Sequence, residues 1–292
     1  MFKSTFWLIV AMVAAGAVLW IASKPALLRE QVLARSQASG LVAYFATRGN
    51  SLAALARSGT TADMEIFLSQ WAKKGITVGV ILTDENGIVR FNVNVLGTTD
   101  TGMSVEDRDY FRWAKTSGKE GEYFVGKPVI SRLGASKGRM IVPLASPVYR
   151  GGEFKGVAVA AIELAPLTER YMDLMKISGY TEVYLIGQDG DLLYAPGADL
   201  TGKSVFEVLR ARPFLGSEYI SRRLKAVLES GEEGKLWLVY RSPRSGSLQF
   251  RSGAYTPAKV HDQRWLVVVS SPLDEAFGFR PVPGQDQKTL SK

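Results

Sequence analysis

Residues 76–95 read Ile-Thr-Val-Gly-Val-Ile-Leu-Thr-Asp-Glu-Asn-Gly-Ile-Val-Arg-Phe-Asn-Val-Asn-Val. Two apolar, β-branched runs, 76–83 and 88–95, flank a four-residue turn at 84–87. Asn-Gly between two such runs is a strong signal for a β-hairpin, because both residues tolerate the left-handed backbone that a tight turn needs. The stretch therefore predicts two adjacent antiparallel strands.

The same pattern recurs further along the chain. The turn at 84–87 is echoed by Gly-Gln-Asp-Gly at 187–190, and the apolar run at 157–163 by the run at 265–271. Self-similarity at a fixed offset, here about 100 residues, is typical of a duplicated module. We expect two similar α/β (α+β) modules, each an antiparallel sheet flanked by helices. The further predicted strands are 122–125, 128–132, 139–149, 154–164, 183–186, 192–195, 235–241, 248–257 and 264–271, and the predicted helices are 165–176, 204–211 and 218–229.

Two helices are predicted before the first module. Apolar residues recur at spacings of three and four over residues 26–58, which is the period of an α-helix. Gly40 and Gly49 weaken the prediction of one unbroken helix, since glycine is unfavourable in a helix interior. A second helix is expected at 61–74, with Gly75 as its C-terminal stop.

The N-terminus carries an uncharged stretch from Ser4 to Ser23, between Lys3 and Lys24. A transmembrane helix needs about 20 apolar residues, so this stretch is long enough to cross a bilayer. Two interpretations are open: a retained signal anchor, which we favour, and a cleaved signal peptide ending near Ala22-Ser23. In either case we expect the bulk of the chain in the periplasm or extracellular space.

The composition excludes several classes of function. The 292 residues include no cysteine and one histidine, His261, so disulfides, thiolate catalysis and Cys- or His-rich metal sites are excluded. His261 is interpreted as a hairpin-turn residue. The net charge of +8 is dispersed along the chain, without the dense basic stripe that nucleic-acid binding requires. Because no catalytic constellation or nucleotide motif is found, we expect neither an enzyme nor a bound cofactor or metal.

Residues 107–114, Asp-Arg-Asp-Tyr-Phe-Arg-Trp-Ala, place a guanidinium beside three aromatic rings at the start of a predicted helix. Ser104 precedes Asp107 by three residues, a spacing typical of a capping box. Arg108 can donate two parallel hydrogen bonds to a carboxylate, and apolar rings around it would strengthen that ion pair. The alternative is that Arg108 pairs with a neighbouring acid, Glu106 or Asp109, while the rings fill the core. The candidate ligand-binding residues are Arg108, Tyr110, Phe111, Trp113, Tyr123 and Arg139.

Several short motifs occur in a fixed order along the chain. They are Asp107-Arg-Asp-Tyr-Phe111, Gly126-Lys-Pro-Val129, Ser146-Pro-Val-Tyr149, Gly152-Glu-Phe-Lys-Gly-Val157, Ile162-Glu-Leu164, the strand 265–269 and Ser271-Pro-Leu-Asp-Glu-Ala276. In these motifs the chain, from about residue 30 to 277, resembles a double Cache domain. Such domains are the extracytoplasmic sensors of bacterial chemoreceptors, histidine kinases and diguanylate cyclases. The resemblance implies two PAS-like modules, of which the membrane-distal one holds the ligand.

The resemblance also implies roles for individual residues. Arg108 and Tyr110 would contact a ligand carboxylate, with Phe111 beside them. Family members that bind amino acids place a Tyr near Val129 and an Asp near Ala161 to hold the ammonium group, and both positions are apolar here. A buried ammonium group would lack its counter-charge, so a simple organic acid such as pyruvate, acetate or a C4-dicarboxylate is expected. The implied domains are a transmembrane anchor (1–24), a long helix with a second helix (25–75), a membrane-distal module (76–178), a membrane-proximal module (179–277) and a polar tail (278–292).

The implied partners are a small organic acid, the inner membrane and a signalling protein that reads a shift of the long helix. The long helix also offers a surface for a homodimer. A receptor of this family would continue into a second span and an output domain, so we expect a stand-alone anchored sensor or a fragment of a receptor. The competing hypothesis is a structural or partner-binding envelope protein with a vestigial pocket.

Overall fold

The computed structural model describes residues 2–72, 75–97, 100–173, 176, 178–196, 200–211, 217–241 and 248–273, with only the backbone of residues 2–22, 173, 238, 240, 241 and 248. The chain divides into two compact units. Unit 1 comprises Met1–Ala38, Met175–Pro257 and Leu266–Lys292, and unit 2 comprises Ser39–Leu174 and Ala258–Trp265. The predicted polar tail, 278–292, and the last two residues of the predicted helix 61–74 lie outside the described residues.

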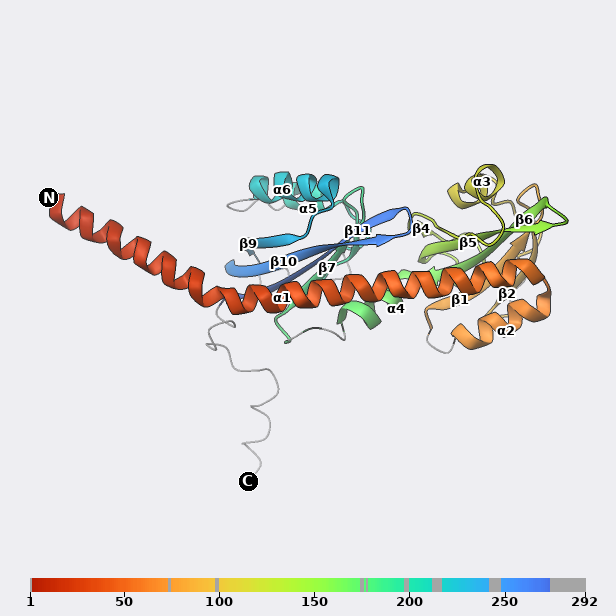
Figure 1. Ribbon diagram of the computed structural model, residues 1–292, viewed down its shortest axis with the longest axis horizontal. Helices are drawn as coiled ribbons and strands as arrows, with labels where there is room; N and C mark the ends of the chain where they lie inside the picture. Colours follow the sequence, from red (N-terminus) through yellow and green to blue (C-terminus); the bar gives the residue numbers. More distant parts are fainter. Residues whose placement is uncertain are drawn as a thin grey trace, which may run out of the picture. The chain divides into compact units, whose positions relative to one another are not determined.

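The first helix, α1, runs without interruption over Phe2–Ser58 (Figure 1). The predicted helix 26–58 is therefore confirmed, and the helical backbone extends further toward the N-terminus. Pro25, Gly40 and Gly49 all lie inside it. The buried side chains in its C-terminal half recur at helical spacing and include Leu41, Tyr44, Phe45, Arg48, Leu52 and Leu55.

A helix long and apolar enough to cross a membrane was not found within the described residues. The predicted anchor at 1–24 falls largely on residues whose side chains lie outside the described part of the chain.

Unit 2 contains one antiparallel sheet with the strand order β2-β1-β6-β5-β3, in which β4 also pairs with β5. The predicted hairpin is confirmed: β1 and β2 pair in antiparallel fashion across the turn at 84–87. Gly87 has a φ of 80°, and the Asp84 carboxylate accepts hydrogen bonds from the backbone N–H groups of Asn86 and Ile88. The strands are β1 (Thr77–Thr83), β2 (Val89–Asn94), β3 (Phe124–Val125), β4 (Val129–Ile130), β5 (Met140–Arg150) and β6 (Glu153–Glu163).

The helices of unit 2 differ from the predictions at their ends. Helix α3 begins one residue after Arg108, which is its N-cap but makes no side-chain cap hydrogen bond, so the capping box predicted at Ser104 is wrong. The Ser104 hydroxyl instead accepts a hydrogen bond from the Glu106 N–H. The predicted helix 165–176 is a short α4 continued by a π-helical turn, η2. The helices are α2 (Thr61–Ala72), α3 (Asp109–Thr116), α4 (Leu164–Thr168), η1 (Gly134–Ser136) and η2 (Glu169–Asp173).

Unit 1 repeats the sheet of unit 2. Its strand order, β8-β7-β11-β10-β9, corresponds strand for strand to β2-β1-β6-β5-β3 of unit 2. The predicted duplication is therefore visible in the topology, and the fold is α+β with two antiparallel sheets. Apolar side chains of α5 and α6 pack against Tyr255, Leu266 and Val268 of this sheet. The elements are β7 (Glu182–Ile186), β8 (Leu192–Tyr194), α5 (Val205–Ala211), α6 (Ser217–Ser230), β9 (Gly234–Arg241), β10 (Leu248–Val260) and β11 (Gln263–Pro272).

Candidate functional site

Unit 2 contains a cavity over one face of its sheet, with about 710 Å³ of empty space, part of which is open to solvent. The strand residues that line it alternate along the sheet, as Gly79 and Ile81 do on β1 and Val159 and Ala161 on β6, because every second side chain of a strand points to the same face. The remaining walls come from β2, β5, the loop before α3 and the segment 131–136. The cavity therefore lies between the sheet and the start of α3.

Arg108 and Tyr110 line this cavity from the first turn of α3. Arg108 has an extended backbone (φ −81°, ψ 144°), and its Nη2 donates to the Ile130 carbonyl at 3.5 Å. Tyr110 is 5% exposed, and burial raises the pKa of its phenol, although the Arg108 charge opposes that shift. The predicted guanidinium and phenol are thus brought together at one cavity.

The neighbouring acids are engaged by groups other than Arg108. Arg132 forms an ion pair with Asp107, with 2.5 Å between Arg132 Nη2 and Asp107 Oδ2, and this pairing lowers the pKa of Asp107. Asp109 accepts hydrogen bonds from the backbone N–H groups of Tyr110 and Lys127. Among the described residues, no carboxylate lies within ion-pair distance of Arg108. The guanidinium of Arg108 is therefore available to an anion in the cavity.

Arg132, which is paired with Asp107, also lines the cavity, and the rest of the polar lining consists of neutral groups. The amide of Asn94, which is 7% exposed, donates to Asn92 Oδ1 at 3.1 Å, and Asn92 in turn donates to Asp100 at 3.4 Å. Ser136 donates to Ser131, whose hydroxyl donates to the Leu133 carbonyl. Sequence reasoning did not identify these residues. The alternation of polar and apolar residues at 92–94 was the available signal, because it places two amides on one face of a strand.

The four other candidate residues do not line the cavity. Phe111 is 1% exposed and belongs to the apolar core between α3 and the sheet. Trp113 stacks on Phe124 with 5.1 Å between ring centroids. Tyr123 packs its ring against His261 at 5.2 Å. Arg139 forms an ion pair with Glu163.

His261 lies in the two-residue turn between β10 and β11, as predicted, with a φ of 54°. Its ring is in contact with aromatic side chains rather than fully solvated: the centroids of Trp113, Tyr123 and Phe124 lie 6.5, 5.2 and 6.0 Å away. In the described part of the chain, no group of three or more acidic or histidine side chains could hold a metal ion.

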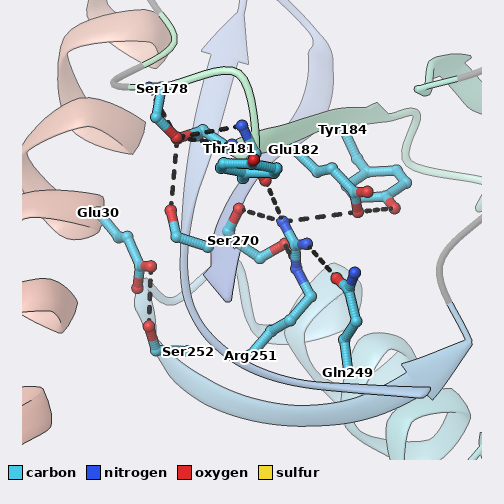
Figure 2. Close-up of polar contacts among 11 residues, drawn as sticks. Glu30, Ser178, Thr181, Glu182, Tyr184, Gln249, Arg251, Ser252 and Ser270 are labelled. Carbon is cyan, nitrogen blue, oxygen red and sulfur yellow. Dashed lines mark hydrogen bonds and ion pairs between the residues drawn. The ribbon is translucent and has the colours of Figure 1, made fainter. Parts of the chain in front are cut away.

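A second polar cluster lies in unit 1, around Arg251 of β10 (Figure 2). Arg251 is 1% exposed and donates to Gln249 Oε1 at 2.9 Å and to the backbone carbonyls of Tyr180 and Ser270 at 2.8 and 2.7 Å. The Glu182 carboxylate lies 3.6 Å from Arg251 Nη2. These contacts satisfy the guanidinium within the protein, so we assign this cluster a structural role.

Glu30 of α1 belongs to the same unit and is fully buried. Ser252 Oγ donates to its Oε1 at 2.8 Å, as the dashed line in Figure 2 marks. Burial raises the pKa of Glu30 to about 7, against hydrogen bonds from Ser252 and Ser271 and the charge of Arg29, which lower it. This carboxyl group therefore changes its charge near neutral pH.

The chain belongs to the Cache domain family, whose sequence profile matches residues 24–278. No curated protein matches the sequence.

Several solved structures share the fold. An amino acid chemoreceptor domain of Pseudomonas aeruginosa, PctB in complex with L-Gln, is 16% identical, with a TM-score of 0.58 over 85% of this chain and 92% of that one. The ligand-binding domain of the Pseudomonas fluorescens chemoreceptor CtaA in complex with L-isoleucine is 18% identical, with a TM-score of 0.60 over 91% and 98%. An extracellular ligand binding receptor from Desulfohalobium retbaense is 15% identical, with a TM-score of 0.62. The match covers 82% of this chain but only 39% of that receptor's length.

Proposed function

We propose that this protein is an extracytoplasmic sensor that captures a small organic carboxylate in the cavity of unit 2. The observation that carries this proposal is the position of Arg108, which lines the cavity without a carboxylate partner among the described residues. A guanidinium stays charged at any relevant pH and can bind both oxygens of a carboxylate. Tyr110 lies beside it and offers a hydroxyl donor.

The cavity favours an organic acid over an amino acid. The chemoreceptor domains of similar fold contain L-Gln or L-isoleucine, and an amino acid needs a negative or strongly accepting group for its ammonium. In this cavity Val129 and Ala161 are apolar, and Asn92 and Ser131 are neutral. A desolvated ammonium without a counter-charge is costly, so the ligand we propose carries a carboxylate and an uncharged remainder.

The proposed signal is a shift of α1 that a partner protein reads. Unit 2 supplies residues 39–58 of this helix and unit 1 supplies residues 2–38, so the helix is continuous through both units. Ligand binding moves such a helix only if the ligand has different affinities for the two arrangements. We place the protein at the inner membrane through the stretch 1–24, with a homodimer through α1 as the assembly.

The alternative is a structural or partner-binding envelope protein whose cavity no longer binds a ligand. A vestigial cavity predicts no stabilisation by any small acid, and co-purification with a membrane protein instead.

A thermal-shift screen of the full chain separates these functions. The sodium salts of acetate, pyruvate and C4-dicarboxylates are compared with L-amino acids at equal ionic strength. A ligand at a hundredfold excess over its dissociation constant stabilises the folded state by about 2.7 kcal/mol, which is readily visible as a rise in melting temperature. Stabilisation by an organic acid supports the proposal. Stabilisation by amino acids alone, or by none of these compounds, would contradict it.

A further inference from the structure

Arg48 of α1 is a buried cation without a counter-ion among the described residues. The residue is 3% exposed. No side chain in the described part of the chain pairs with its charge, and its Nε and Nη1 atoms have no hydrogen-bond acceptor. The two residues after α2 in the sequence are lysines, which add no negative charge. Burying an uncompensated guanidinium is strongly unfavourable, so we expect a negatively charged group to bind beside Arg48.

Two aromatic rings lie next to this guanidinium. Arg48 Cζ lies 3.0 Å from the ring centroid of Trp71 on α2 and 4.9 Å from that of Tyr44, one helical turn earlier on α1. Stacking of this kind stabilises the cation through the electron-rich ring faces. It leaves the N–H groups of Nε and Nη1 without acceptors.

Three further buried polar groups beside Arg48 are also unpartnered. They are Trp71 Nε1, the Tyr44 hydroxyl and the Thr77 hydroxyl. Burial raises the pKa of the Tyr44 phenol, and the side chains of Arg48 and Thr77, which come near its hydroxyl without forming a hydrogen bond of good geometry, oppose that shift. Arginine and tryptophan N–H groups can only donate, and both hydroxyls can donate as well. The cluster is thus rich in donors and poor in acceptors.

The cluster is separate from the cavity of the proposed carboxylate site. Thr77 pairs with Ile162, whereas Gly79 pairs with Ala161, so the register of β1 shifts between Thr77 and Gly79. Paired residues of an antiparallel ladder share a face, and Ile162 and Ala161 point to opposite faces. The shift therefore turns Thr77 away from the face that Gly79 and Ala161 present to the cavity.

We propose that Tyr44, Arg48, Trp71 and Thr77 bind a small monovalent anion of the halide type, such as chloride. One negative charge compensates the guanidinium, and a spherical ion can accept hydrogen bonds from several donors without directional demands. The anion links α1, α2 and β1, since the four donors come from these three elements. It stabilises the packing of α1 on unit 2 and is independent of organic-acid capture.

Bromide replaces chloride chemically and is visible by its anomalous X-ray scattering. Crystals of the full chain grown in bromide are expected to show an anomalous peak within hydrogen-bond distance of Arg48 and Trp71 Nε1. A map in which Arg48 contacts only water, or turns to a carboxylate, would overturn the proposal.

The solution test compares the melting temperature in sodium chloride and in sodium gluconate at equal ionic strength. We expect chloride to raise the melting temperature of the wild type by about 3–6 °C more than gluconate does. Arg48→Met should abolish this difference, and Arg57→Met, an exposed arginine of the same helix, should retain it. If Arg48→Met does not fold, Trp71→Phe keeps the ring, removes the N–H donor and should reduce the difference. Equal responses to the two salts in the wild type would refute a specific anion, even with a bromide peak at molar concentration.

Discussion

Arg139 and Glu163 form a two-point ion pair in unit 2: Arg139 Nη2 lies 2.8 Å from Glu163 Oε1, and Arg139 Nη1 donates to Glu163 Oε2 at 2.9 Å. The sequence predicts Arg139 as a ligand residue, but in the structure its charge is already compensated. Arg108 has no such partner among the described acids. Of these two arginines, Arg108 is therefore the one with a free charge for an external carboxylate.

Removing Arg139 should destabilise the protein in a pH-dependent way. Glu163 is 5% exposed, and burial raises its pKa while Arg139 opposes that shift. In Arg139→Met the pKa of Glu163 rises further above its unfolded value. The cost, about 1–3 kcal/mol in the free energy of unfolding, should then be present at pH 7.5 and disappear as the pH falls and Glu163 is protonated. Urea unfolding at a series of pH values measures this.

The matched control is Arg132→Met. Arg132 and its partner Asp107 have side chains that are 50% and 55% exposed, and exposed pairs contribute only about 0–1 kcal/mol. Equal losses of stability in the two variants would show that the burial of Glu163 does not matter.

Gly49→Ala should destabilise the protein, although alanine is the better helix former by about 1 kcal/mol. A Cβ atom at Gly49 would overlap the ring of Tyr123. Overpacking of this kind typically costs about 1–3 kcal/mol. Thermal or urea unfolding checks the sign of the effect.

A double-mutant cycle isolates the cause. Gly49→Ala should cost much less in a Tyr123→Ala background, where the ring is absent. Gly40→Ala serves as the milder control, because its Cβ would lie 3.3 Å from the nearest ring atom of Tyr171. Stabilisation by Gly49→Ala in the wild-type background would disprove the close approach.

Glu30→Gln should flatten the pH dependence of stability. The folded-state pKa of Glu30, about 7, lies above the ordinary value of 4.5. Between these values the folded state holds a proton that the unfolded state has released, so stability falls as the pH rises from 4.5 to 7 and then levels off. At about 1.4 kcal/mol per pKa unit, the expected loss is about 3.5 kcal/mol.

The amide of the Glu30→Gln variant stays neutral, so the variant should match the wild type near pH 4.5 and exceed its stability at pH 8. Urea unfolding of both proteins across this range gives the difference directly. Parallel pH curves for the two proteins would mean that Glu30 ionises without cost in the folded state.

Ala161→Asp should change the selectivity of the cavity. A carboxylate at this position of the wall repels an organic anion and supplies the counter-charge that an ammonium group lacks. We expect at least a tenfold loss of organic-acid affinity and stabilisation by amino acids in the thermal-shift screen. Ala165→Asp adds the same charge at an exposed position of α4 and should change neither response. Unchanged organic-acid affinity in Ala161→Asp would remove this wall from the ligand site.

The sequence predicted the elements whose signals are local. The turn at 84–87 and the periodicity of 26–58 identified a hairpin and a helix, because turn chemistry and helical period are properties of neighbouring residues. Gly40 and Gly49 argued against a continuous helix over 26–58, yet tertiary packing explains Gly49, which makes room for Tyr123.

Features that depend on distant residues were not predictable. The cavity combines Asn92, Arg108, Ser131 and Ala161, which only the sheet and α3 bring together. The capping box at Ser104 failed because α3 begins later, at Asp109. Trp113 and Tyr123 were assigned to a ligand site on residue type alone, whereas their rings pack around His261, more than a hundred residues away in sequence. Residue type indicates a possible chemistry, but the strand register decides which side chains meet.

Isothermal titration calorimetry of the full chain with the organic acid identified in the screen tests the central claim most directly. Arg108→Ala should weaken binding by about 2 kcal/mol or more, roughly thirtyfold, because the ligand carboxylate loses its charged partner. Arg112→Ala removes an exposed arginine one turn further along α3 and should leave the affinity unchanged. An Arg108→Ala variant that binds the acid as tightly as the wild type would contradict the account.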